Sequence, residues 1–334
     1  MRFVISLLLL FAVISCNNSN NPDVSDIRVD LTTYRFEKDF SSLDTTNLTS
    51  EITQLRNEYP TFADNFFTTI LNTDPTWPAE KSAQYISGFL SSYKPVFDTA
   101  GIVFSNFDKY EKELEKAFQY LAYYFPSYKS PRKIITYVGP LDGFGDILSD
   151  DAIIVGLHHH LGNFSLYKSM LVHETYPGYI SNRFQPSYIS VNAMKNIVLD
   201  IFPEKFEDKT LILQMVEKGK RLYMLSKLLP DTEEYKLIGY TQDQLKESYT
   251  NERFIWDLFV QNNFLQTNDN NVIKNYVGES PKTMELGERS PGNIGSFAGW
   301  QIVKKYMSKY PELPLKDLMI KDAEEIFREA KYKP

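Results

Sequence analysis

The chain has 334 residues, a formal net charge of −7 at pH 7 and 43% hydrophobic residues. A chain of this length and composition can bury a large hydrophobic core. Its acidic balance argues against a nucleic-acid-binding protein, because such proteins use clustered lysines and arginines to displace counterions from phosphates. Aromatic residues make up 14% of the chain, and we interpret them as core and interface packing.

The N-terminus has the pattern of an export signal. An apolar run at residues 3–14 follows Arg2 and is shorter than the roughly 20 residues of a membrane span. The next residues complete the segment Val13-Ile14-Ser15-Cys16, which resembles a bacterial lipobox. We therefore predict a lipoprotein signal peptide at residues 1–15 and lipidation of Cys16, and several acyl chains on that residue would anchor the protein durably. The alternative is that Cys16 is a leftover thiol in a signal peptide cut elsewhere.

The chain after Cys16 divides into a tether and a domain. Residues 16–26 are polar and unpatterned, so we predict a tether. Residues 27–334 show no repeat and no second composition, and we predict one mainly helical domain there. Cys16 is the only cysteine, so the exported part has no internal disulfide. We expect a lipid-anchored position in the cell envelope, at the outer membrane and facing the periplasm.

The elements expected along the chain are mostly helical. Residues 27–40 alternate in part and predict an extended segment. Two β-branched stretches bounded by turn residues, 133–138 and 152–157, predict strands. Apolar spacing and caps predict helices at residues 48–59, 62–71, 82–93, 105–125, 188–202, 211–229, 242–264, 297–306 and 315–330. The predicted fold class is therefore mainly α with a small β-sheet (α+β).

All four histidines lie between residues 156 and 177. His158, His159 and His160 are consecutive at the end of a predicted strand, where neighbouring side chains face opposite sides and do not converge on one metal ion. We interpret them as a partly exposed, polar strand end, and a fortuitous surface metal site is the alternative.

His173-Glu174 has the start of the metallopeptidase motif H-E-x-x-H, but Pro177 stands where the second histidine would be. Proline offers no ligand atom. We therefore predict that His173 is a polar residue at a helix end and that Glu174 is a solvated or capping carboxylate.

Other groups of residues in the sequence do not indicate a catalytic or phosphate-binding site. The chain has no G-x-S-x-G segment and no phosphate-binding loop with G-K-S/T. Gly299 is predicted to allow close approach of its helix to a neighbour. Arg183 and Arg289 lie in stretches rich in glycine and proline, and we expect them to hold these loops through buried ion pairs with Glu288 or Glu217, in preference to binding a ligand.

Several segments together resemble a known family. The chain contains, in this order, YRFEKDFSSLDTTNLTSEITQLRNEYPTF, IIVGLHHHLG, YPGYISNRFQPSYI, KGKRLYMLSKLLPDTEEYKLIGYTQDQL, SPGNIGSFAGWQIVKKYM and AKYKP. They cover about residues 34–334 and are similar to the gliding-motility lipoprotein GldB family of Bacteroidetes. The resemblance implies a cell-envelope lipoprotein associated with gliding motility and the protein secretion that accompanies it. It implies no known reaction.

That family is in turn distantly similar to zinc-peptidase-like proteins with an H-E-x-x-H helix, which implies a degenerate zincin-like scaffold. At the corresponding positions this chain has Asn192, Ala193 and Asn196, and Glu217 falls where a third ligand could lie. An amide is a poor zinc ligand and alanine cannot act as a general base. The implied site is catalytically silent. The alternative is that residues 188–202 form an ordinary packed helix.

The sequence therefore favours a non-enzymatic, lipid-anchored envelope protein, without cofactor or metal, that binds other gliding or secretion components. Its expected partners are the membrane, through the lipid, and envelope proteins, with no nucleic acid. Two alternatives stay open. One is a metal-dependent hydrolase on a zincin-like scaffold, and the other is a lipoprotein that captures peptides or glycans in a deep pocket.

Overall fold

The computed structural model describes residues 21–334, so Cys16 and the predicted signal peptide lie outside the described residues. The described chain is mainly helical with one small sheet, which confirms the predicted fold class. The strands are β1 (Thr32–Arg35), β2 (Lys133–Tyr137), β3 (Ile147–Leu148) and β4 (Ala152–Gly156). The helices of the N-terminal part are α1 (Phe36–Ser41), α2 (Leu48–Glu58), α3 (Phe62–Asn65), α4 (Ala79–Ser92), α5 (Lys94–Val103) and α6 (Asp108–Tyr124).

The remaining helices follow the sheet in the chain. Those next to it are α7 (Met170–Thr175), α8 (Gly178–Ser181) and α9 (Ile189–Ile201). The C-terminal group consists of α10 (Leu211–Leu228), α11 (Glu234–Ile238), α12 (Gln242–Thr250), α13 (Glu252–Gln261), α14 (Asn270–Val277), α15 (Ile294–Lys309), α16 (Leu315–Ile320) and α17 (Ala323–Ala330).

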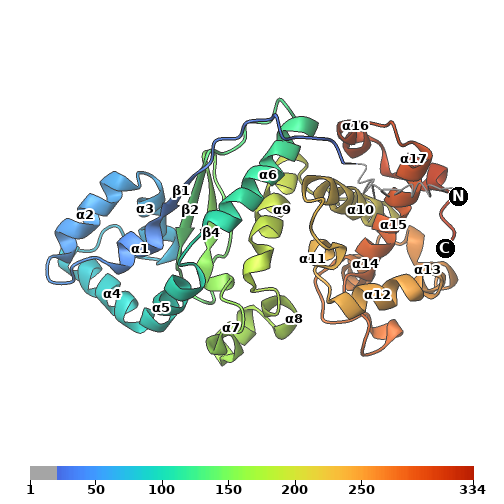
Figure 1. The fold of residues 1–334 in the computed structure, drawn as a ribbon. Helices are drawn as coiled ribbons and strands as arrows, with labels where there is room; N and C mark the ends of the chain where they lie inside the picture. Colours follow the sequence, from blue (N-terminus) through green and yellow to red (C-terminus); the bar gives the residue numbers. More distant parts are fainter. Residues whose placement is uncertain (1–20) are drawn as a thin grey trace, which may run out of the picture.

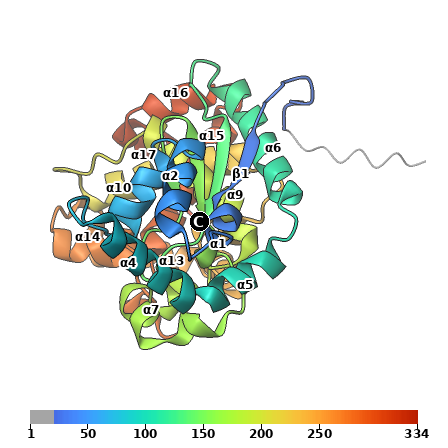
Figure 2. The ribbon, with the colours of Figure 1, turned by 90° about the vertical axis from the view of Figure 1, so that its left-hand side faces the viewer.

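The sheet separates two groups of helices (Figure 1). Helices α1–α5 lie on one side, and α6 and α9 lie on the other, with the C-terminal group beyond them. Figure 2 looks onto the α1–α5 side, with the sheet behind these helices. The chain enters along the edge of this arrangement, where Val24 is buried and the Gln119 amide donates a hydrogen bond to the carbonyl of Ile27.

The sheet has the order β1-β2-β4-β3. Strands β1, β2 and β4 are parallel, and β3 is antiparallel to β4. Both predicted strands are confirmed as β2 and β4. The predicted extended segment at 27–40 is correct only for β1, because Phe36 begins a short helix there. β3 was not predicted, since two residues are too few to show an alternating pattern.

The aromatic residues form much of the core, as predicted. Phe36 lies within 4.7–5.6 Å, between ring centroids, of four aromatic neighbours, Phe40, Tyr59, Phe62 and Phe66. Most of these pairs have the edge-to-face geometry that aromatic rings prefer. This cluster packs α1–α3 against one face of the sheet.

Helices α10 and α15 cross at two glycines. A Cβ atom added to Gly299 would lie 1.7 Å from the carbonyl oxygen of Met215, and one added to Gly219 would lie 2.3 Å from the carbonyl oxygen of Gly299. No side chain fits at either position, so the two backbones are in direct contact. The predicted use of Gly299 is confirmed.

Two predicted helices are divided. The stretch 315–330 forms α16 and α17, separated at Lys321 and Asp322. The stretch 242–264 forms α12 and α13, separated at Asn251. A capping box is present at the start of α12, where the Thr241 hydroxyl accepts from the backbone of Gln244 and the Gln244 side chain accepts from the backbone of Thr241.

Candidate functional site

The histidine run lies at the carboxyl end of β4, inside the protein. His158 and His160 are fully buried and His159 is 5% exposed. The prediction of a partly exposed strand end was wrong, and so was the alternative of a surface metal site. The chain leaves β4 through a 3-10 turn, Leu157–His159, which carries the imidazoles into the space between the sheet and the loop that joins β2 to β3.

All three imidazoles bind that loop, residues 139–146, which we call the β2–β3 loop. His158 accepts from the backbone N–H of Gly139 through Nδ1 (3.1 Å), and its Nε2 donates to the carbonyl of Phe144 (2.9 Å). The Nε2 of His159 donates to the carbonyl of Leu141 (3.0 Å). His160 binds the carboxylate of Asp146. Three consecutive histidines therefore form hydrogen bonds with both ends and the middle of the β2–β3 loop.

His160 and Asp146 form a buried ion pair. The His160 Nε2 lies 2.8 Å from Oδ2 of Asp146, and the two side chains are 0% and 4% exposed. The other ring nitrogen of His160 faces the carbonyl of Gln185 at 3.0 Å. Because both nitrogens face acceptors, both carry protons and the ring is cationic.

The pKa values of this pair follow from the charges. Burial alone would lower the pKa of His160, but the negative charge and hydrogen bonds of Asp146 raise it above its usual value. Burial alone would raise the pKa of Asp146, but His160, the Asn192 amide and the Gly156 backbone N–H together lower it. Both groups are therefore held in their charged forms.

His158 and His159 are held in the neutral form instead. Burial lowers the pKa of His158 well below its usual value. Burial also lowers the pKa of His159 to about 4. The ring of His159 stacks on Phe184 with centroids 4.2 Å apart, and it meets Tyr176 edge-on. One histidine of the run is thus an ion and two are uncharged hydrogen-bonding groups in an aromatic setting.

Helix α9 completes this cluster. The Asn192 amide donates to Oδ2 of Asp146 (2.9 Å), and the Asn196 amide donates to the backbone carbonyl of Asp146 (3.1 Å). The two asparagines lie one helical turn apart on the face of α9 that packs against β3 and β4. Ala193, between them, is buried. Of the predicted degenerate metal positions on α9, Asn192 therefore binds the Asp146 carboxylate and Asn196 binds the Asp146 backbone carbonyl.

Glu217 serves another network. Its carboxylate lies 3.2 Å from Lys209 Nζ, 3.2 Å from Lys220 Nζ and 3.4 Å from Arg221 Nη1. Lys220 also donates to the carbonyls of Met319 and Lys321, so the network ties α10 to the segment around α16. Among residues 21–334, no hydrogen bond joins Glu217 to the asparagines of α9.

The histidine cluster has limited chemical capacity. Within residues 21–334, no three histidine, cysteine, aspartate or glutamate side chains are grouped so that they could hold a metal ion. A general base needs a free lone pair close to its substrate. His160 has both nitrogens in contact with acceptors, and His158 has one nitrogen accepting and one donating. These two imidazoles hold the β2–β3 loop, and neither has a lone pair to offer a substrate.

The second histidine feature of the sequence is exposed. His173 and Glu174 lie in the last turn of α7 and are exposed. This confirms the prediction of a polar helix end, and Pro177 lies beyond that end.

Of the two arginines predicted to hold loops, Arg183 does so and Arg289 does not. Arg183 forms a two-fold contact with Glu279, at 3.2 and 3.1 Å, and so holds the loop after α8. The predicted partners, Glu288 and Glu217, were wrong. The Arg289 side chain is 87% exposed and lies 3.5 Å from Glu247, so it is no buried anchor. Glu288 is also exposed and pairs with Lys282.

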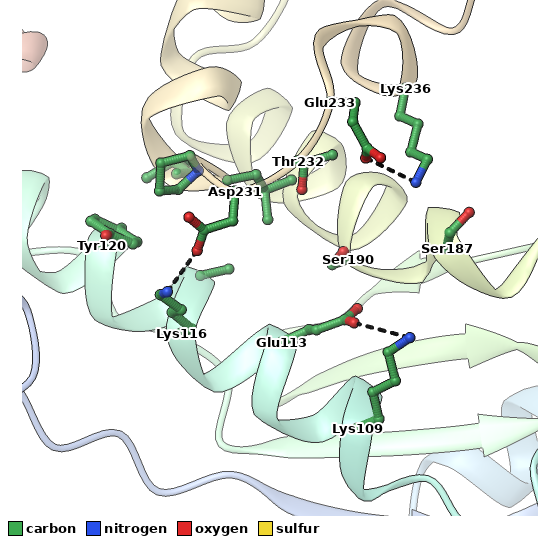
Figure 3. A pocket seen from close by; sticks show the side chains of 14 residues that line it. Lys109, Glu113, Lys116, Tyr120, Ser187, Ser190, Asp231, Thr232, Glu233 and Lys236 are labelled. Carbon is green, nitrogen blue, oxygen red and sulfur yellow. Dashed lines mark hydrogen bonds and ion pairs between the residues drawn. The ribbon is translucent and has the colours of Figure 1, made fainter. Parts of the chain in front are cut away.

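A polar pocket lies between α6, the start of α9 and the loop before α11 (Figure 3). Its volume is about 230 Å³. Each of its three lysines has a carboxylate partner: Lys116 pairs with Asp231, Lys236 with Glu233, and Lys109 with Glu113. Burial raises the pKa of Glu113. The charges of the pocket are thus balanced internally, which does not favour an ionic ligand.

Comparison with known protein families shows to which family the chain belongs. A family model described as gliding motility protein GldB matches residues 17–334. The chain belongs to this family. The family name supports a gliding-motility lipoprotein of the cell envelope. The comparisons with curated proteins and with solved structures returned no match.

For this GldB family member, the structure adds one finding on the membrane. No helix within residues 21–334 is both long enough and apolar enough to cross a bilayer.

Sequence reasoning missed Asp146, the residue on which the cluster is centred. It is one of four aspartates between residues 142 and 151, with Asp142, Asp150 and Asp151. The pattern of the loop offered no signal that would select it. Its role depends on the pairing of β3 with β4, which brings Asp146 beside Gly156 and hence beside the histidine run.

Proposed function

We propose that this GldB family member is a lipid-anchored, non-catalytic component of the gliding and secretion apparatus, and that it acts by binding other envelope proteins at the outer membrane, facing the periplasm. Three observations support the proposal. The family model covers the chain from residue 17, and the sequence before it ends in a lipobox-like segment at Cys16. Hydrogen bonds occupy both ring nitrogens of His158 and of His160 and the carboxylate of Asp146.

The observation that carries the proposal is the set of contacts made by Asp146. This carboxylate is the only acid that the three buried histidines meet through a hydrogen bond within residues 21–334. It is already bound by His160, Asn192 and the Gly156 backbone. An enzyme of the zincin type would need open ligand positions and an activated water there.

We further infer that the scaffold is zincin-like and silent. Helix α9 packs beside β3 and β4, which supports the assignment of Asn192, Ala193 and Asn196 to the former metal positions. Glu217 does not support it, since its carboxylate is engaged by three cations.

Complementation of a strain that lacks the gene would test this function. The double variant Asp146→Asn with His160→Gln removes the charges and any acid–base capacity while leaving polar groups that can bond. We expect it to restore gliding in proportion to the amount of folded protein at a permissive temperature. A variant that accumulates in the membrane at the wild-type level and does not support gliding would contradict a non-catalytic role for the cluster.

A second experiment identifies the proteins that bind this protein in the membrane. Affinity purification of the tagged, anchored protein from its own membranes should recover gliding or secretion proteins in fixed ratios. The matched control is Cys16→Ser, which should recover them less efficiently because the protein is released from the membrane.

A further inference from the structure

We propose that the part of the β-sheet face that helices α1–α3 leave uncovered is a docking groove for a cationic, apolar polypeptide segment. This sheet groove is bounded by the sheet, by the end of α2 with the following turn, and by the β2–β3 loop. Its volume is about 990 Å³, which is in the range of ligand sites in proteins. The proposal deepens the proposed function by naming the chemistry of one partner, and it rests on that function.

The floor of the sheet groove is one row of side chains across all four strands. The register aligns Tyr34 with Ile135, Ile135 with Ile154, and Ile154 with Ile147. Side chains at paired positions share one face of a sheet, and all four residues line the groove. Helices α1–α3 cover this face only in part: Ile135 and Ile154 are 8% and 7% exposed, whereas Tyr34 is 39% exposed. The row forms an apolar floor.

The residue with the most exposed apolar side chain of the sheet groove has its backbone fixed by the histidine cluster. Phe144 is 54% exposed, although its backbone carbonyl accepts from His158 Nε2 and from the hydroxyl of Tyr137 (2.6 Å). Both donors are buried. An exposed aromatic side chain on a fixed backbone, at the border of an apolar surface, is typical of an interface anchor, because little backbone entropy is lost on binding. The buried histidine cluster therefore contributes to the position of a residue on the protein surface.

The charges of the sheet groove determine which occupant fits. Its lining contains one lysine, Lys133, against three carboxylates, Glu58, Asp150 and Asp151. Lys133 is paired with Asp151 at 2.8 Å. Within residues 21–334, Glu58 and Asp150 have no cationic partner within 4.0 Å. The groove is therefore an apolar floor with two uncompensated negative charges.

A basic polypeptide segment matches this combination better than the other occupants. Anionic phospholipids and acidic glycans would be repelled by Glu58 and Asp150. A second copy of this chain, with its net charge of −7, is disfavoured for the same reason. The tether does not fit either, since residues 17–26 contain no lysine or arginine. A segment with alternating apolar and cationic side chains would place one set on the floor and the other against the carboxylates.

Peptide binding to the purified protein, residues 17–334, tests the proposal. The probes are a fluorescent octapeptide of alternating valine and lysine, the same peptide with glutamate in place of lysine, and vesicles of phosphatidylethanolamine and phosphatidylglycerol. We expect the lysine peptide to bind at least tenfold more tightly than the glutamate peptide, with affinity falling as salt rises. Equal binding of both peptides, absence of binding at millimolar concentration, or preference for the vesicles would overturn the proposal.

Variants locate the binding. Phe144→Ser and the pair Glu58→Lys with Asp150→Lys should each weaken lysine-peptide binding at least tenfold. The matched control is Ile102→Ser, since Ile102 is 78% exposed and lies on α5, outside the sheet groove. All of these positions are exposed, and thermal unfolding checks that the fold is kept. Binding that is equally weakened in the control, or unchanged in the groove variants, would place the peptide elsewhere and overturn the proposal.

Gliding assays separate this proposal from the proposed function. Groove variants that are folded and anchored should fail to restore gliding, whereas Ile102→Ser should restore it. If the groove variants restore gliding fully, the sheet groove is not the docking site but the proposed function stands. If the strain that lacks the gene glides normally, the proposed function itself is wrong.

Discussion

His160 and Asp146 form a buried ion pair, with Nε2 and Oδ2 2.8 Å apart, that joins the end of β4 to the segment just before β3. The two residues are 14 positions apart in the chain, and the β2–β3 loop ends at Asp146. The pair is therefore the fixed point from which the rest of the β2–β3 loop, including the exposed Phe144, is positioned.

We predict that removing the charge of either His160 or Asp146 alone strongly destabilises the protein. Asp146→Asn leaves the charge of His160 buried without a partner, and His160→Gln does the same to Asp146. Each should lower the free energy of unfolding by about 3–5 kcal/mol. The double variant should cost clearly less than the sum of the two, and urea unfolding of all four proteins measures the coupling. Strict additivity would mean that the two groups do not interact.

The stability of the protein should depend on pH in both directions from neutrality. The pKa values of His158 and His159 are lowered in the folded state, to about 4 for His159. Their contribution is complete above the unfolded-state pKa of about 6.5 and is lost as the pH falls. For His159 the loss amounts to about 3 kcal/mol between pH 7 and pH 4. Asp146, whose pKa is also lowered, adds to the loss at still lower pH.

On the alkaline side the sign is reversed. The pKa of His160 is raised in the folded state. Its contribution is complete below about pH 6.5 and is lost as the pH rises through the folded-state value. Urea midpoints between pH 4 and pH 10 should therefore pass through a maximum near neutrality. The control is His159→Gln, which should flatten the acid branch only. An acid branch of unchanged slope in that variant would contradict a buried neutral His159.

Gly299→Ala should destabilise the protein, because even one added carbon atom would lie 1.7 Å from the carbonyl oxygen of Met215. We expect a loss of about 1–3 kcal/mol, with a larger loss for Gly299→Leu. The matched control is Gly88→Ala in α4, where an added carbon meets nothing within 4 Å. That substitution should be neutral or stabilise by about 1 kcal/mol. Equal thermal midpoints for the two alanine variants would rule out a tight crossing of α10 and α15.

Cys16→Ser should abolish lipid anchoring. The variant should remain as the unprocessed precursor or appear in the soluble fraction, whereas the wild-type protein should stay with membranes. Fractionation followed by immunoblotting makes the comparison, and metabolic labelling with a palmitate analogue identifies the lipid. A membrane fraction and label incorporation equal to those of the wild-type protein would contradict lipidation at this residue.

Much of the fold could be predicted from the sequence because its signals are local. The β-branched runs at β2 and β4, the capping box at Thr241 and the small residue at Gly299 each depend on a few neighbouring positions. The division of the helix at Asn251 was missed, since the apolar pattern continues across it. Strand β3, which pairs with β4, was missed because it is only two residues long.

The candidate site was harder to predict because it is built from contacts between distant segments. Consecutive histidines on a regular strand would point to opposite sides, and the sequence therefore argued against their convergence on one metal ion. It did not reveal the 3-10 turn that begins at Leu157 and brings all three rings to a single loop. Burial of three imidazoles is favourable only when each has a partner. Those partners are mostly backbone carbonyls, which no sequence pattern distinguishes.

The protonation states of the histidines test most directly the claim that the run clamps the β2–β3 loop and holds no metal. Nitrogen-15 NMR of histidine-labelled protein at pH 7, with His173→Gln to assign the exposed ring, reports them. We predict that His158 and His159 are neutral with the proton on Nε2, that His160 is doubly protonated, and that added zinc changes none of these signals. A neutral His160, or a shift of the run's signals on addition of one equivalent of zinc, would contradict the clamp.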